Sequence, residues 1–192
     1  VEHYDYNPEK AKEILENAGC TMDADGFYER NGEEIGFVIS VMSGEQDRID
    51  IAQAAAQQLQ EIGINCTVDI PAQMDWGGQM ACLIGWGSPF DADDHTYKVF
   101  GTDKGANYSG YSNEKVDEYL TLARQYEDQE TRAKYYDLFQ EELAKDPAYA
   151  FICYIDANYV AASDIKGISE KTVLGHHGVG IFWNIQDWEI VK

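Results

Sequence analysis

Hydrophobic positions in the first part of the chain switch between helical and extended spacing. Residues 7–19, NPEKAKEILENAG, repeat apolar side chains at helical spacing, open with the Asn-Pro pair typical of a helix start and end at a glycine. In residues 35–41 apolar side chains stand at alternate positions, as in a strand. Residues 45–62 return to helical spacing, and in residues 64–70 the alternation of a strand recurs. Strand, helix and strand with short connections predict a βαβ unit, with parallel strands and helices covering the sheet.

Turn-forming pairs and a third apolar run complete this half of the chain. Asp25-Gly26 and Asn31-Gly32 predict tight turns in a hairpin-like segment ahead of the first strand. The run MACLIGW, residues 80–86, predicts a further strand. The carboxyl end of this strand leads into the loop GWGSPFDADDH, residues 85–95. The sequence DHTYKVF then predicts a short helix that Asp93 or Asp94 would cap.

The second half begins with two strongly patterned helices and ends in weaker patterns. Residues 112–126 and 128–146 predict helices whose buried faces hold Val116, Leu120, Ala123, Tyr136, Phe139 and Leu143. The apolar segment AYAFICYIDANYVAA, residues 148–162, predicts a strand or a strand pair. Residues 181–191, IFWNIQDWEIV, have enough β-branched and aromatic side chains for a last strand. The whole pattern indicates an α/β fold.

Composition narrows the class of function. The chain has 192 residues, 44% of them hydrophobic, which is enough for one domain with a packed core. A net charge of -21 argues against nucleic-acid binding and against an anionic membrane surface, because both need clustered Lys and Arg. No apolar run reaches the length of a membrane span, and the first residues, VEHYDYNPEK, lack the order of a secretory signal.

The four cysteines predict core thiols. Cys20, Cys66, Cys82 and Cys153 show no CxxC spacing and no histidine at metal-ligand spacing. Three of them lie in apolar runs, where a free thiol behaves as a small hydrophobic side chain. One disulfide among the four stays open.

Few side chains form a pattern that could carry chemistry. Asp23, Asp25 and Gly26 resemble the start of a calcium loop, but the later ligand positions are missing, so an Asx turn is the favoured interpretation. His176 and His177 are adjacent and would point to opposite sides of an extended backbone, so one of them at most is expected to face a ligand. Because neither a nucleophile elbow nor a phosphate-binding glycine pattern is present, we expect no catalytic residue, no metal site and no cofactor.

The loop at residues 85–95 is the best candidate for ligand binding. In open α/β sheets, ligands lie beyond the carboxyl ends of the strands, where this loop is expected. Trp86 and Phe90 offer broad apolar faces, and Gly85 and Gly87 allow a ligand or another backbone to come close. The alternative, that Trp86 is a core residue at a strand end, stays open.

Five segments together resemble one known family. They are YNPEKAKEILENAG, RIDIAQAAAQQLQEIGI, GWGSPFDADDHTYKVF, NYSGYSNEKVDEYL and YYDLFQEELAKDPAYAFICY, in this order. They resemble the carboxy-terminal lobe of the family 5 extracellular solute-binding proteins, the peptide and nickel receptors of ABC importers. The resemblance implies a periplasmic-binding-protein type II lobe with a central mixed sheet covered by helices. It implies that residues 1–192 form a single carboxy-terminal lobe of a longer two-lobe receptor, in which residues 178–192 return toward the missing amino-terminal lobe as a final strand.

The same resemblance implies a function outside the cytoplasm. The receptor would be a cell-surface lipoprotein or a periplasmic protein that captures a peptide or peptide-like solute between its lobes and delivers it to an ABC permease. A nickel or other metal-chelate ligand is the alternative within the family. A hydrolase that uses the carboxylates of residues Asp91 to Asp94 is a more distant alternative, because paired acids also arise by chance in a chain with 35 Asp and Glu residues.

The resemblance also suggests which residues contact the ligand. We expect Trp86, Gly87, Ser88, Phe90 and Asp91 to line the site, and His176 or His177 to face it. In peptide receptors of the family, an Asp about three residues after the Trp pairs with the terminal amine of the peptide; Pro89 occupies that place here. Nickel receptors carry a Trp-Gly-x-Pro-Tyr-Asp run, whose aromatic residues correspond to Trp86 and Phe90. Both ligand classes therefore remain open, with peptide the first expectation.

Overall fold

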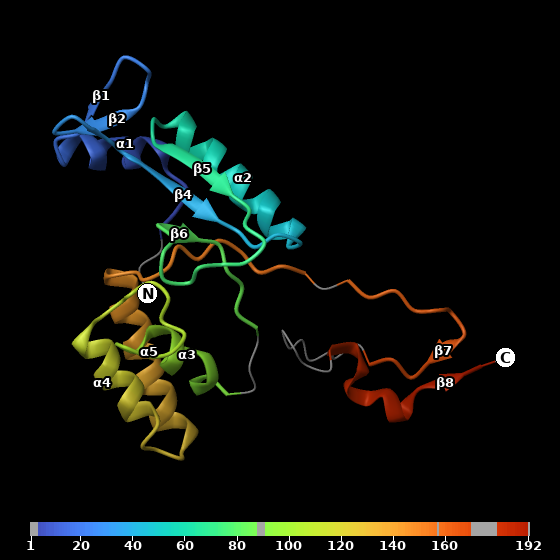
Figure 1. Ribbon diagram of the computed structural model, residues 1–192. Helices are drawn as coiled ribbons and strands as arrows, with labels where there is room; N and C mark the ends of the chain where they lie inside the picture. The colour runs from blue at the N-terminus through green and yellow to red at the C-terminus, as the bar shows by residue number, and fades with distance from the viewer. Residues whose placement is uncertain (1–3, 88–90, 157, 170–179, 192) are drawn as a thin grey trace. The chain divides into compact units, whose positions relative to one another are not determined.

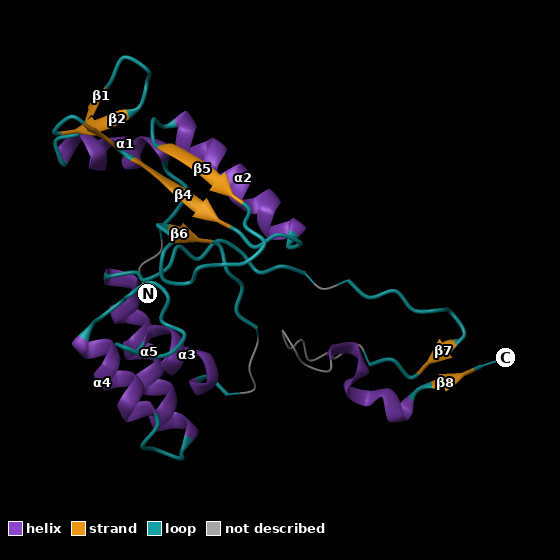
Figure 2. Cartoon of the chain, in the orientation of Figure 1, coloured by secondary structure: helices purple, strands orange, loops and turns teal. Residues whose placement is uncertain are grey.

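The computed structural model describes residues 4–87, 91–156, 158–169 and 180–191 (Figure 1). The chain divides between Gly85 and Trp86 into two compact units. We call them the amino-terminal unit and the carboxy-terminal unit. Strands dominate the first, and the helices α3, α4 and α5 dominate the second (Figure 2).

The amino-terminal unit opens with a capped helix and a small antiparallel sheet. Helix α1 spans Pro8–Asn17, and the Asn7 side chain accepts a hydrogen bond from the Lys10 N–H at 2.9 Å, as the Asn-Pro pair predicts. Strands β1 (Thr21–Met22), β2 (Tyr28–Arg30) and β3 (Glu33–Glu34) pair in that order, all antiparallel. Asn31 and Gly32 both have positive φ, 56° and 81°, which is the backbone of the predicted tight turn.

The predicted Asx turn at residues 23–27 is confirmed. The Asp23 carboxylate accepts hydrogen bonds from the N–H groups of Asp25 and Phe27, at 2.9 and 2.8 Å. These bonds hold the loop between β1 and β2, so the first Asp of the calcium-like sequence has a structural role.

The predicted βαβ unit is confirmed. Strand β4 (Gly36–Ser40), helix α2 (Gln46–Glu61) and strand β5 (Asn65–Asp69) follow one another, and β4 and β5 pair in parallel. Strand β6 (Ala81–Cys82) pairs in parallel with the other edge of β4, so the strand order is β5-β4-β6. Val41, Ile49 and Ala52 form the buried core between this sheet and α2.

One expectation for this unit needs correction. The third strand has only two residues, although the Leu83 N–H extends the pairing with a hydrogen bond to the Ser40 carbonyl at 3.1 Å. Helix α1 buries none of its residues, and Ile14 is 57% exposed. Helical spacing shows which side chains share a face, but it does not show what covers that face.

The carboxy-terminal unit is built on three helices. They are α3 (Asp93–Phe100), α4 (Glu114–Ala123) and α5 (Gln129–Lys145). Their shared core consists of six buried side chains from all three helices: Val99, Phe100, Val116, Leu120, Phe139 and Leu143. The predicted inward faces of α4 and α5 are confirmed at five positions, while Tyr136 is half-buried.

We expect Asn113→Ala to destabilise the carboxy-terminal unit by about 1 kcal/mol. The Asn113 side chain accepts hydrogen bonds from the N–H groups of Lys115 and Val116, at 3.0 and 3.2 Å, and alanine leaves both without this acceptor. Urea unfolding followed by circular dichroism measures the change. Asn113→Asp keeps an acceptor oxygen at the same place and is the control; an equal loss in both variants would contradict the capping role.

The last part of the chain differs most from the sequence prediction. The described residues between 148 and 162 contain no strand, and residues 180–187 form a 3₁₀ helix, η1 (Gly180–Asp187). Strand β7 (Ile165–Lys166) pairs antiparallel with β8 (Glu189–Ile190). The expected final strand is therefore reduced to β8, while residues 178, 179 and 192 lie outside the described part. A strand needs a neighbour for its backbone hydrogen bonds, and apolar composition alone does not provide one.

The cysteines are confirmed as core thiols in part. Cys20 and Cys66 are buried and Cys82 is half-buried, but Cys153 is exposed, because its apolar run does not enter a core. All four are free thiols in this structure. Burial raises the pKa of the Cys66 and Cys82 thiols, which keeps them protonated and unreactive near neutral pH.

Candidate ligand-binding site

The candidate loop is described at both of its ends. Trp86 and Gly87 follow β6, and Asp91 precedes α3. The expected contacts at Ser88 and Phe90, together with Pro89, lie outside the described residues, as do His176 and His177. Their predicted roles therefore stay predictions.

Trp86 is a partly exposed aromatic side chain with protein on one side. The centroid of its ring lies 5.4 Å from that of the His95 ring and 6.2 Å from that of the Tyr108 ring. The planes of the indole and of the Tyr108 ring are almost parallel, at 14°. Trp86 remains 36% exposed. The interpretation of Trp86 as an enclosed core residue is therefore wrong. An aromatic ring that is backed by protein and open to solvent can stack on a ligand with little loss of side-chain entropy.

Gly85 has a different role from the one its sequence position suggests. A Cβ atom at this position would come within 2.7 Å of the Arg48 guanidinium. The close approach that this glycine allows is therefore that of the Arg48 side chain, which also pairs with Glu45 at 3.2 Å.

Asp91 organises the first turn of α3. Its carboxylate accepts a hydrogen bond from the Asp93 N–H at 2.9 Å, and its carbonyl accepts one from the Asp94 N–H at 3.2 Å. The expected capping role of Asp93 or Asp94 was wrong. Helix α3 begins at Asp93, so the acceptor for its first N–H groups has to come from a residue before it.

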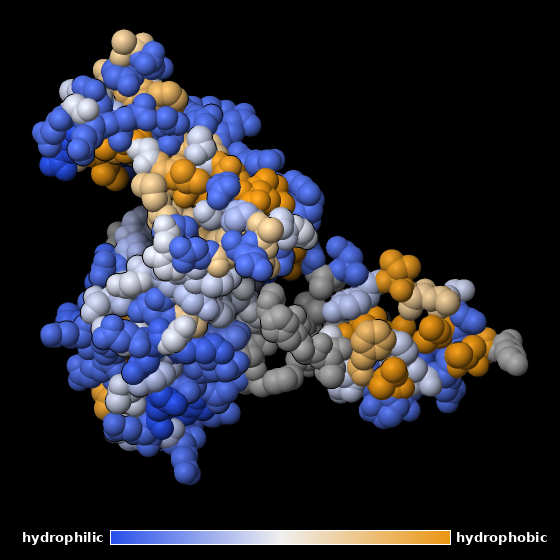
Figure 3. Space-filling view, viewed as in Figure 1, coloured by the Kyte–Doolittle hydropathy of each residue, from blue (hydrophilic) through white to orange (hydrophobic). Residues whose placement is uncertain are grey.

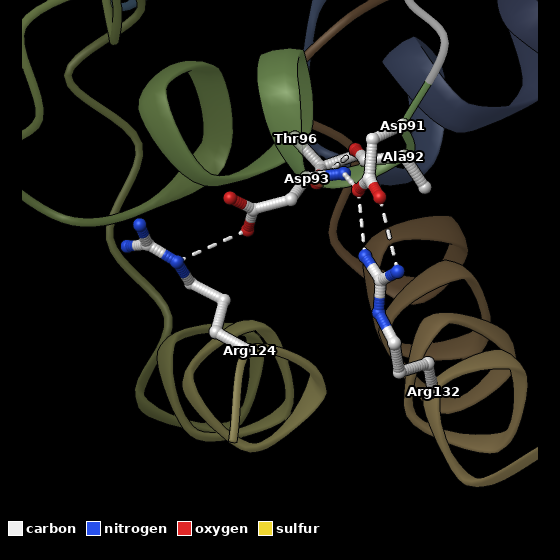
Figure 4. Close-up of polar contacts among 6 residues, drawn as sticks. All are labelled: Asp91, Ala92, Asp93, Thr96, Arg124 and Arg132. Atoms are coloured by element: carbon white, nitrogen blue, oxygen red, sulfur yellow. Dashed lines mark hydrogen bonds and ion pairs between the residues drawn. The ribbon is translucent and has the colours of Figure 1, made fainter. Parts of the chain in front are cut away.

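Two arginines reach the start of α3 from the neighbouring helices (Figure 4). Arg132 of α5 donates two hydrogen bonds to the Asp91 carboxylate, at 2.6 and 3.0 Å. Arg124, directly after α4, forms an ion pair with Asp93 at 3.2 Å. The Arg132 hydrogen bonds, helped by the Asp93 N–H, lower the pKa of Asp91 to about 2. Asp91 is therefore charged and paired throughout the physiological pH range.

These charged residues surround an open hollow of about 430 Å³. It is lined by Asp91, Asp93, Asp94, Arg124, Tyr126 and Arg132. Asp94 also has a cation partner, since Lys98 lies 3.2 Å away one turn further along α3. The carboxylates of this acidic cluster thus have counter-charges from the chain itself.

The pairing with Arg132 makes Asp91 unsuited to act as a general acid. A general acid that works near neutral pH needs a raised pKa, and the pKa of Asp91 is lowered.

In the described part of the chain, no group of three or more His, Cys, Asp or Glu side chains could hold a metal ion. None of the helices described is long and apolar enough to cross a membrane.

Three residues of this region were not predicted as parts of a site: Tyr108, Arg124 and Arg132. His95 lies in the candidate loop, but its contact with Trp86 was not predicted. Arg132 is 41 residues away from Asp91 in the chain, so no local spacing could join the two. Tyr108 lies in one of the segments that carry the family resemblance, but its stacking on Trp86 depends on the fold.

Comparison with known proteins now defines the class of the fold. The solved structures that the chain resembles are type II periplasmic binding proteins, and the chain has a lobe of this fold. The sequence model of one protein family, the bacterial extracellular solute-binding proteins, family 5 (middle region), matches residues 1–108. The chain belongs to this family.

Three relatives show what the chain is similar to. The structure of NikZ from Campylobacter jejuni in complex with Ni(L-His) has a TM-score of 0.84 and 36% identity, over 98% of this chain and 40% of that one. The oligopeptide-binding protein AppA of Bacillus subtilis is 27% identical over the whole chain, and its nonapeptide complex superposes with a TM-score of 0.78. Protein XP55 of Streptomyces lividans is 31% identical over 84% of the chain.

The chain spans only part of these relatives. It covers 36% of AppA and 31% of XP55. The activity, ligand and partners of the whole protein are accordingly matters of proposal.

Proposed function

We propose that this chain is the ligand-capturing lobe of the substrate-binding component of an ABC importer. Trp86 and Gly87, with Ser88 and Phe90, form one wall of the ligand site, and Asp91 anchors the end of the loop that carries them. The observation that carries this proposal is the indole of Trp86, which is backed by Tyr108 and remains open to solvent in a chain of a solute-binding family.

A peptide or peptide-like solute is the first candidate ligand. AppA, part of which matches the whole of this chain, is an oligopeptide-binding protein. An apolar stacking surface suits a ligand whose side chains vary, because stacking does not depend on one particular functional group.

A metal chelate is the second candidate, and one observation favours it. The NikZ structure, with 36% identity and a TM-score of 0.84, holds Ni(L-His). Its ligand includes an amino acid with an aromatic ring, so an aromatic wall serves both classes of ligand. His176 and His177 are the residues to examine as chelate contacts in this case.

We further propose that residues 1–192 form a carboxy-terminal lobe of a longer receptor. Large apolar side chains are exposed along residues 151–160 and 182–191, among them Tyr154 at 101%, Val160 at 100% and Ile190 at 72%. Figure 3 shows apolar surface gathered around β7 and β8. Such a surface suits packing against a preceding lobe of the same polypeptide. The receptor acts outside the cytoplasm, as a lipoprotein or in the periplasm, and passes its ligand to an ABC permease without chemical change.

Ligand identification on the full-length protein tests this proposal. The protein is purified without denaturation, and bound small molecules are analysed by mass spectrometry together with metal analysis. A bound peptide or a nickel chelate, at about one per protein, supports the respective candidate. A protein that carries neither, and that binds neither a peptide library nor Ni²⁺ with L-histidine, contradicts it.

The isolated 192-residue chain should bind the same ligand at least about 100-fold more weakly than the full-length protein. Affinity in a two-lobe receptor depends on both walls and on their closure, and one wall alone loses most of the buried contact. Isothermal titration calorimetry of both proteins measures the difference. Equal affinity would show that the ligand does not need a second wall.

A further inference from the structure

We propose that Arg132 is a positioning residue that, through Asp91 and helix α3, determines where the Trp86 ring lies. It does not touch the ligand. The inference rests on the proposed function only where it concerns ligand affinity; its structural part stands on the contacts within the carboxy-terminal unit.

The first step is that Arg132 is itself held in place. It lies in the first turn of α5, the helix that contributes Phe139 and Leu143 to the core. Its guanidinium lies 5.8 Å from the centre of the Tyr136 ring, and its side chain is only 23% exposed. A planar guanidinium held between an aromatic ring and a carboxylate keeps one orientation better than a freely rotating ammonium would.

The second step is the transfer of this position to α3. The two hydrogen bonds from Arg132, at 2.6 and 3.0 Å, fix both oxygens of Asp91, and one of these oxygens also accepts from the Asp93 N–H (Figure 4). A bidentate pair sets direction as well as distance. Arg124 holds the neighbouring Asp93 from the other side, so the start of α3 is tied to both partner helices.

The third step links α3 to Trp86. His95 stands in the first turn of α3, and its ring lies 5.4 Å from the indole of Trp86. The far end of the helix is fixed because Val99 and Phe100 are in the core. When the Arg132–Asp91 pair is broken, the first turn of α3 loses its tie to α5. The His95 ring is then held less firmly, and the Trp86 ring, which packs against it, changes its position.

The test follows the Trp86 ring directly. The full-length protein is labelled with 5-fluorotryptophan, and the Trp86 fluorine resonance is assigned by its loss in Trp86→Phe. We expect Arg132→Gln and Asp91→Asn each to shift or broaden this resonance without ligand. The double variant should show no larger change than either single variant, because both remove the same interaction. Arg132→Lys should fall between wild type and Arg132→Gln.

Controls separate this role from general stabilisation. Lys115→Gln removes a different ion pair, which joins the exposed Lys115 of α4 to the largely covered Glu142 of α5 at 3.7 Å, and should leave the Trp86 resonance unchanged. The thermal unfolding midpoint is measured for every variant, and the change at Trp86 should follow the loss of the Arg132–Asp91 pair and not the loss of midpoint across the set. An unchanged Trp86 resonance in Arg132→Gln, or additive changes in the double variant, would overturn the proposal.

Ligand titration distinguishes this inference from the proposed function. The probes are Ni²⁺ with L-histidine in one arm and a nonapeptide library in the other. We expect Arg132→Gln to weaken binding of whichever probe the wild-type protein binds by about 3-fold to 10-fold. This loss of affinity should be smaller than the loss caused by removing the Trp86 ring itself. A shifted resonance with unchanged affinity supports the positioning role and contradicts Trp86 as a ligand contact. An unshifted resonance, while Trp86→Ala still abolishes binding, contradicts the positioning role alone.

Discussion

Trp86→Ala is expected to weaken ligand binding by the full-length protein by about 30-fold or more. The indole is 36% exposed and supported by Tyr108 and His95, so it presents a rigid apolar surface. Truncating a central aromatic contact of this kind commonly costs 2 kcal/mol or more, which corresponds to roughly 30-fold in affinity. Isothermal titration calorimetry with the co-purified ligand measures the loss.

Tyr126→Ala is the matched control for this experiment. Tyr126 is an aromatic residue of the same unit with similar exposure, 41%, and it stacks on Tyr135 beside the charged hollow. Its loss should change the affinity by less than about twofold. Comparable losses in Trp86→Ala and Tyr126→Ala would mean that general disturbance, and not contact with the ligand, explains the effect.

Leu120→Ala should have the largest effect on stability, about 2–5 kcal/mol in the free energy of unfolding. Leu120 is fully buried, at 0% exposure, and packs among the six core residues that α3, α4 and α5 share. Removing its branched side chain loses apolar burial and leaves a cavity that three helices cannot easily close. Urea unfolding of the 192-residue chain, followed by circular dichroism, measures the change.

Thr121→Ala, at the next position of α4, provides the comparison for Leu120. Thr121 is exposed, so the change should stay within about 0.5 kcal/mol. A loss below about 1 kcal/mol in Leu120→Ala would show that the three helices do not depend on this core.

The elements with local signals were predictable from the sequence. Asn7 with Pro8 marks the start of α1, Asn31-Gly32 marks a tight turn, and the alternation around β4 and β5 marks the parallel pair. In each case the residues that decide the structure are neighbours in the chain or lie within one helical turn. Backbone preference and amphipathic spacing are then enough.

The described residues after Pro147 were less predictable because their structure depends on partners far away in the chain. The run from Phe151 to Ile155 has strand-like composition, yet a strand forms only where another strand accepts its hydrogen bonds. The same composition therefore left an exposed apolar segment, and Cys153 with it, outside any core.

The sequence pattern singles out Trp86 as a candidate ligand contact but does not show which residues surround it. Trp86 could be singled out because an aromatic residue between glycines at a strand end is an unusual pattern. The ring partners His95 and Tyr108, and the arginine that pairs with Asp91, come together only through packing of the helices. The sequence left the acidic residues Asp91 to Asp94 only a distant hydrolytic alternative. In the structure, Asp91 is a charged anchor for the loop and for the start of α3.

A crystal structure of the full-length protein with its co-purified ligand would show whether Trp86 contacts the ligand. We expect the ligand to lie against this lobe with the Trp86 indole in van der Waals contact, at about 4 Å, and with a second wall supplied by the preceding part of the polypeptide. A ligand bound elsewhere, or a Trp86 ring covered by the protein's own side chains in the complex, would contradict it.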